Sequence, residues 1–126
     1  MFLIIATIIL YITEYFALNM DYKLYTTKEF DKDFEKLDYS EQIRVRKILK
    51  QLKEQGGDVG KPLSGLTSFR EKKFDGKRLY YLVYRNMLVI LVLAISDKKA
   101  QQATINRILA DLAEYQQYVF KILGRK

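Results

Sequence analysis

The sequence contains no cysteine, no histidine and no tryptophan, and only one of its 126 residues is proline. Without cysteine there can be no disulfide framework and no thiol nucleophile, and without cysteine and histidine the usual zinc sites are excluded. A mechanism that needs an imidazole is excluded as well. What remains is a chain of one-domain length with 49% apolar and 29% charged residues, a composition typical of a globular fold.

Positive charge is in excess and is unevenly placed along the chain. Lysine and arginine outnumber aspartate and glutamate by 22 to 15, which gives a net charge of +7. Residues 1–19 contain one acid, Glu14, and no basic residue, so the other 14 acids and all 22 bases give the remainder a net charge of +8. This balance favours nucleic acid or another polyanion as a partner, although many ordinary small proteins are also basic.

The first nineteen residues are almost continuously apolar and differ from everything that follows. Three interpretations stay open: a membrane anchor, an additional packed helix or strand, and a stretch added by a misassigned start, with Met20 as the natural first residue. A helix of about 20 residues would cross a bilayer, and the basic excess would keep the domain in the cytoplasm. Glu14 opposes the anchor, because a carboxylate inside the apolar span is costly. We therefore place the domain at 20–126 and predict that it is cytoplasmic.

Hydrophobic periodicity predicts one α+β domain after this segment. Residues 21–26 alternate like a short strand, and two helices follow as a hairpin. Thr26 or Thr27 caps the first helix, and the second begins at Ser40 and ends at a Gly-Gly pair. Three strands and a C-terminal helix complete the order β-α-α-β-β-β-α, with a small antiparallel sheet. Their expected ranges are 68–74, 78–85 and 88–95 for the strands and 101–123 for the helix.

The three predicted strands differ in their patterns. Residues 88–95 are apolar at every position, which predicts a central strand covered on both faces. In the two preceding strands we expect only one face to be core, so the other would be a basic face bordered by aromatic rings. Such a face suits RNA, because cations hold phosphates while tyrosine rings stack on exposed bases. A half-buried sheet with a soluble outer face is the alternative.

The second predicted helix has a row of basic residues on its outer face. The row is interpreted either as a solvated helix face or as a stripe that contacts phosphates, and both interpretations stay open. Its members are Arg44, Arg46, Lys47, Lys50 and Lys53. The motifs of phosphate loops, dinucleotide sites, zinc proteases and EF-hands are all missing from the sequence, so we expect no metal and no cofactor.

Five short motifs occur in an order that is similar to one known family. They are the helical hairpin, KPLSGL at 61–66, FREKKF at 69–74, RLYYLVY at 78–84, and the apolar strand, Lys-Lys pair and helix of 88–115. Together they resemble the RelE/HigB toxins of type II toxin–antitoxin systems, which belong to the RelE/ParE superfamily. The resemblance covers Asp21 to Tyr115.

This resemblance implies a metal-independent endoribonuclease that binds in the ribosomal A site, cleaves mRNA there, and is neutralised by a cognate antitoxin. The 2′-OH of the RNA attacks the adjacent phosphate, so the protein must supply a base, an acid and cations. The implied catalytic residues are Lys72 or Lys73 as general base, with Arg70, Lys98 and Lys99 as phosphate clamps and Tyr81 at the position of a family arginine. The candidate RNA-binding residues are Lys61, Lys77, Arg78, Tyr80 and Arg85.

One position departs from the family pattern. Tyr81 stands where the pattern Y-R-L-V-Y has arginine, and Arg78 would project from the opposite strand face unless a bulge turned it. Two alternatives to the ribonuclease therefore stay open. One is a ParE-like inhibitor of DNA gyrase, and the other is a catalytically decayed module that binds RNA or the antitoxin. Residues 1–19 would add contact with a membrane if they form an anchor.

Overall fold

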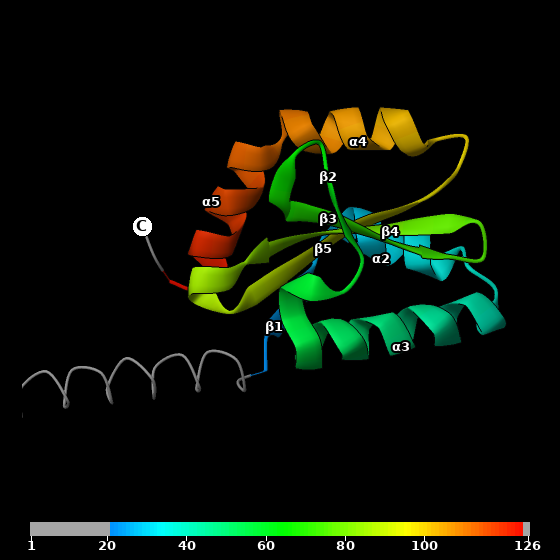
Figure 1. The fold of residues 1–126 in the computed structure, drawn as a ribbon, viewed down its shortest axis with the longest axis horizontal. Helices are drawn as coiled ribbons and strands as arrows, with labels where there is room; N and C mark the ends of the chain where they lie inside the picture. The colour runs from blue at the N-terminus through cyan, green and yellow to red at the C-terminus, as the bar shows by residue number, and fades with distance from the viewer. Residues whose placement is uncertain (1–20, 125–126) are drawn as a thin grey trace, which may run out of the picture.

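The computed structural model describes residues 21–124, which form a five-stranded sheet with helices on both of its faces (Figure 1). Two short 3-10 helices, Gly56–Asp58 and Arg85–Met87, follow α3 and β4. The predicted α+β class is confirmed. The elements are β1 (Lys23–Thr26), α2 (Lys28–Glu35), α3 (Tyr39–Gln55), β2 (Lys61–Leu63), β3 (Leu66–Phe74), β4 (Lys77–Tyr84), β5 (Val89–Asp97), α4 (Gln101–Ala110) and α5 (Leu112–Ile122).

The interpretations of the apolar N-terminal segment concern residues 1–19, which lie outside the described residues. Within 21–124, no helix has both the length and the apolar character needed to cross a membrane. The same range contains no cluster of acidic residues that could hold a metal ion.

The strands lie in the order β1-β5-β4-β3-β2. β1 runs parallel to β5, with Lys23 opposite Val89 and Thr26 opposite Val92. The other three neighbouring pairs are antiparallel, so the sheet is mixed and the expected antiparallel arrangement holds for those three pairs only. Residue periodicity shows which side chains share a face of a strand, but it does not show in which direction a distant strand will pair.

Side-chain caps fix the starts of both N-terminal helices. Thr27 caps α2 by accepting a hydrogen bond from the Phe30 N–H at 3.0 Å, and its hydroxyl donates to the Leu93 carbonyl at 2.7 Å. The cap therefore also ties the helix to the sheet. Helix α3 begins one residue earlier than predicted, because Asp38 and Glu41 form a reciprocal capping box.

β5 extends beyond its short partner β1, and α2 covers the part of its edge that β1 leaves open. The Ile95 N–H donates to the Asp33 carboxylate of α2 at 2.9 Å, and Leu93 accepts from Thr27. Two backbone groups on this edge are therefore satisfied by side chains of a helix rather than by another strand.

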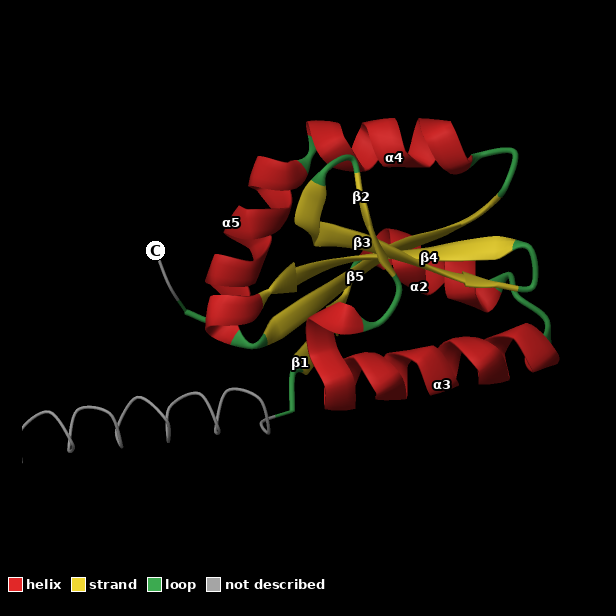
Figure 2. Cartoon of the chain, viewed as in Figure 1, coloured by secondary structure: helices red, strands yellow, loops and turns green. Residues whose placement is uncertain are grey.

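The sheet separates two apolar cores. Helices α2 and α3 cover one face, where Phe30 and Leu52 pack on Ile90 and Val92 of β5. Helices α4 and α5 cover the other, as Figure 2 shows, with Ile108 among the residues packed there. Both faces of β5 are buried, which confirms its prediction as an interior strand.

β4 corrects a second expectation. We predicted that only one face of this strand would be core, but all residues from Arg78 to Val83 are buried. The reason is the second helical layer: α4 and α5 cover the face that the sequence pattern left open. Within the described residues, β4 therefore offers no basic, aromatic-bordered face to a ligand.

The structure also differs from the prediction in the loop before β3 and in the C-terminal helix. The predicted loop 58–65 contains β2, a strand of only three residues that is too short to show alternation. The predicted C-terminal helix is two helices, α4 and α5, which meet at Asp111 and run in different directions (Figure 1). The break lets both helices follow the same curved face of the sheet.

The Lys77–Glu41 ion pair links α3 to the β3–β4 hairpin. We expect it to stabilise the fold only while Glu41 is ionised. The Lys77 ammonium hydrogen-bonds this carboxylate and lowers its pKa below the ordinary value of 4.5. A lowered folded-state pKa contributes stability above the unfolded-state pKa, and this contribution is lost as the pH falls through the folded-state pKa. E41Q should therefore lower the melting temperature at neutral pH but not in strong acid, since glutamine keeps the capping box. Thermal unfolding across this range measures the difference, and a gap that stays constant into strong acid would contradict the expectation.

Candidate active site at the open edge of β3

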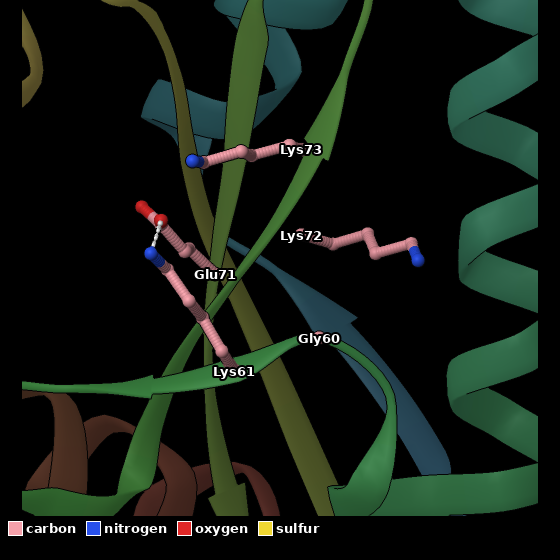
Figure 3. Close-up of a pocket in the computed structure, with 5 residues that line it drawn as sticks. All are labelled: Gly60, Lys61, Glu71, Lys72 and Lys73. Carbon is pink, nitrogen blue, oxygen red and sulfur yellow. Dashed lines mark ion pairs between the residues drawn. The ribbon is translucent and has the colours of Figure 1, made fainter.

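A surface hollow of about 350 Å³ lies where β2 begins, and Gly60, Lys61, Glu71, Lys72 and Lys73 line it (Figure 3). The pairing of β2 with β3 ends at Lys61 opposite Glu71. The residues of β3 from Lys72 onward therefore run past β2 and form an open edge of the sheet among the described residues. A ligand in this hollow reaches side chains from both strands.

Strand alternation divides the candidate residues of β3 between two sides. Lys73 and Glu71 extend to one side of the strand and Lys72 extends to the other, toward α3 (Figure 3). Phe69 lies in the core under α4 and α5, and Phe74 lies in the core under α2 and α3. Both faces of β3 are thus buried at their apolar positions, so the expectation of a single core face is wrong for this strand as well. Because Lys72 and Lys73 lie on opposite faces, they do not act on one atom together.

Glu71 is the most unusual side chain of the hollow. Its carboxylate is fully buried, with the Lys61 ammonium 3.4 Å from Oε1. The Gln101 side chain of α4 donates to Oε2 at 3.3 Å, while Oε1 has no hydrogen-bond partner among the described residues. Because burying a carboxylate is costly unless cations and donors compensate, Lys61 and Gln101 are what make this position tolerable.

Arg78 lies on the same side of the sheet, directly opposite Lys73. It is 7% exposed, its Nη1 donates to the Gly76 carbonyl at 3.3 Å, and its Nε has no partner within the described range. The pairing of β4 with β5 shifts register after Tyr80, but the extra residue belongs to β5, so Arg78 is not turned. It therefore projects opposite to Tyr81, as its position in the strand predicts.

Arg70 and Tyr81 hold the loop before β2, which lines the hollow through Gly60. Arg70 is 8% exposed and donates to the carbonyls of Val59 at 3.4 Å, Gly60 at 3.0 Å and Thr67 at 3.3 Å. The fully buried Tyr81 hydroxyl also donates to Val59. Burial raises the pKa of Tyr81, and Arg70 opposes the rise. The expectation of a guanidinium free to clamp phosphate is corrected here, because Arg70 is buried and each of its three nitrogens donates to a backbone carbonyl.

Tyr80 requires a similar correction. Its ring is fully buried under α4 and α5, and its hydroxyl lies 2.8 Å from the Ser96 hydroxyl. Burial raises the pKa of this phenol. The ring therefore has no face for stacking on an RNA base, because α4 and α5 cover the side of β4 that we expected to be open.

The remaining predicted residues lie away from the hollow. Lys77 is bound to Glu41 of α3, and Arg85 lies in the second 3-10 helix, 3.4 Å from the Asp58 carboxylate. Lys98 and Lys99 are exposed in the connection between β5 and α4. This connection follows Ser96, which pairs with Arg78, so the two lysines stand at the same end of the sheet as Lys73 but two strands away.

Sequence reasoning missed Glu71 and its partner Gln101. The signal for Glu71 was present, because it is the acid in the basic strand FREKKF and alternates with Phe69 on the inward face. Gln101 carried no comparable signal, since its contact depends on how α4 returns over the sheet. The structure thus replaces an expected patch of cations with a buried carboxylate surrounded by cations.

The described fold is shared by solved toxin structures. A doubly substituted RelE toxin from Escherichia coli in the free state is 22% identical and has a TM-score of 0.59, with 71% of this chain and 99% of that chain covered. A RelBE toxin–antitoxin complex from Mycobacterium tuberculosis is 20% identical with a TM-score of 0.55, covering 63% and 93%. A RelB–RelE complex from Methanococcus jannaschii is 14% identical with a TM-score of 0.51, covering 63% and 95%.

These likenesses show that the chain has the fold of RelE toxins over the part that the solved structures cover. No protein-family model matches the sequence, and no curated protein matches it significantly.

We expect Arg70 to act on stability through the loop before β2. R70M keeps much of the side-chain volume but removes the donor to the carbonyls of Gly60 and Thr67, while Val59 keeps the Tyr81 hydroxyl. The loss should cost about 2–4 kcal/mol. Urea unfolding measures the loss. R44M is the matched control, because Arg44 pairs with Asp75 at 2.7 Å on the surface, where such pairs contribute about 0–1 kcal/mol. Equal losses in both variants would show that the contacts of Arg70 do not hold the loop.

Proposed function

We propose that this protein is the toxin of a type II toxin–antitoxin system and that it cleaves mRNA on the ribosome. The observation that carries the proposal is the buried Glu71 carboxylate in a hollow lined by lysines. The RelE-like fold supports the toxin class, and the net positive charge of the domain supports an RNA substrate. The reaction needs no metal and no cofactor, because a base, an acid and cations are sufficient.

In this proposal Glu71 is the general base. Its Oε1 has no hydrogen-bond partner among the described residues, so it is able to accept a proton once Lys61 moves aside. Lys61 is 59% exposed and lies on the three-residue strand β2, so its side chain is free to leave the carboxylate for a phosphate. This assignment differs from the general base that we expected from the resemblance, Lys72 or Lys73.

The proton and the phosphoryl group then move in a balanced sequence. The carboxylate of Glu71 takes the proton of the 2′-OH, and the 2′-oxygen forms a bond to phosphorus. The bond from phosphorus to the 5′-oxygen breaks, and the Lys73 ammonium gives that oxygen a proton. Lys61 and Arg78 stabilise the negative charge that develops on the phosphate. The products are a 2′,3′-cyclic phosphate and a 5′-hydroxyl, and Glu71 returns its proton to Lys73 through solvent.

The proposed cognate antitoxin would cover this hollow. Structures that share the fold include toxins in complex with RelB antitoxins. An acidic side chain of the antitoxin that pairs with Lys61 and Lys73 would occupy the position of the substrate phosphate. Lys98 and Lys99 remain candidates for contacts with more distant phosphates of the mRNA, because they are exposed at the same end of the sheet.

Primer extension of an mRNA on translating ribosomes tests the function. Wild-type protein should cut the message, and E71Q and K73Q should each cut it at least about 100-fold more slowly, since a positioned base or acid contributes that much. K121Q, a change on the exposed outer side of α5, should behave like the wild type.

The results of these assays distinguish between the candidate general bases and between the alternative functions. Cleavage by E71Q at the wild-type rate, with a large loss in K72Q instead, would overturn Glu71 as the base and favour Lys72. Absence of cleavage by the wild type would overturn the ribonuclease. Inhibition of gyrase supercoiling by the same preparation would then identify the ParE-like alternative, whereas a protein without either activity would be the decayed binding module.

A further inference from the structure

The side chain of Gln101 is the contact through which α4 reaches the hollow. Gln101 is the first residue of α4, and its amide donates to Glu71 Oε2 at 3.3 Å. The Lys61 ammonium lies beside the other oxygen, 3.4 Å from Oε1, and points toward it from β2 (Figure 3). In the proposed reaction Lys61 leaves the carboxylate for the phosphate. Among residues 21–124, Gln101 is then the side chain that still holds Glu71.

Hydrogen bonds anchor the chain just before Gln101 to the sheet. The Ser96 hydroxyl donates its hydrogen to the Asp97 carbonyl at 3.0 Å, so the Tyr80 hydroxyl, 2.8 Å away, is the donor to Ser96. The Asp97 carboxylate accepts from the Ala100 N–H at 2.8 Å. Because the Tyr80 ring is fully buried, these contacts tie the start of α4 to the core. The amide of Gln101 therefore approaches Glu71 from an anchored backbone.

The next glutamine along α4 makes a different contact. Gln102 is exposed, and its amide donates to the Asn106 side chain of the same helix at 2.9 Å. Gln101 is half-buried and reaches across to β3 instead. The two neighbours therefore have the same side chain in the same helical turn, and only the first of them touches the carboxylate of the hollow.

We infer that Gln101 is a positioning residue for the general base, because by holding Oε2 of Glu71 it directs Oε1 toward the substrate. A carboxylate is planar, so fixing one oxygen limits rotation about the last side-chain bond and thereby sets the direction of the other oxygen. Proton transfer requires that oxygen to lie within hydrogen-bond reach of the 2′-OH, and a small misplacement lowers the rate strongly. The inference deepens the proposed function and rests on it, since that function assigns the proton transfer to Glu71.

Steady-state cleavage of an mRNA on programmed ribosomes tests the inference. Q101M keeps the length of the side chain but removes the donor, and it should lower kcat at least about tenfold. KM should stay unchanged, because Lys61 and Lys73 still bind the phosphate. Q101K restores a donor on a side chain of similar length and should keep most of the wild-type kcat. Q102M is the matched control and should behave like the wild type, because the amide that it removes does not touch Glu71.

A double-mutant cycle shows whether Gln101 acts through Glu71. In the E71Q background, Q101M should cause no further loss of kcat, because the carboxylate that Gln101 positions is gone. A further loss as large as that in the wild type overturns the inference, and so does an equal loss in Q101K and Q101M, which would mean that the donor does not matter. If the wild type cleaves and Q101M retains its kcat, the inference fails and the proposed function stands. If the wild type does not cleave, the proposed function fails and the positioning role fails with it.

Discussion

β5 determines the architecture, because its side chains are apolar on both faces and both faces must be removed from water. Helices α2 and α3 cover one face and α4 and α5 cover the other. A sheet covered in this way has no open face for a ligand. A ligand can therefore bind to the sheet only where the helices do not cover it, and the hollow beside β2 is such a place.

The same constraint separates the charged residues into two groups. Most lysines and arginines lie at the rims, where water solvates them, while Glu71, Arg70 and Arg78 lie inside. Arg70 is compensated by backbone carbonyls and Glu71 by Lys61 and Gln101. Only partial compensation is found for Glu71 and Arg78, each of which has one buried polar atom without a partner among the described residues. Incomplete compensation of two opposite charges on the same face is what makes this corner of the sheet chemically distinct.

Local patterns in the sequence predicted the elements well, because caps and periodicity depend on neighbouring residues. The two N-terminal helices, the interior position of β5 and the two faces of β3 all follow from such patterns. The parallel pairing of β1, the three-residue β2 and the break at Asp111 depend on distant contacts. The site was predicted less completely. Two of the candidate residues, Lys61 and Lys73, line the hollow. Tyr80, Tyr81 and Arg70 are buried by layers that periodicity does not reveal, and Glu71 was overlooked beside its basic neighbours.

The way α2 closes the exposed part of β5 limits which other strands can pair with the sheet. Thr27 and Asp33 occupy backbone groups on which a strand of another molecule could otherwise assemble. At the opposite end of the sheet, the uncovered part of β3 carries Lys72 and Lys73, whose charges repel an identical edge. Pairing with a strand of another molecule is thereby opposed at the two places where an inner strand runs past its short neighbour, β5 beyond β1 and β3 beyond β2.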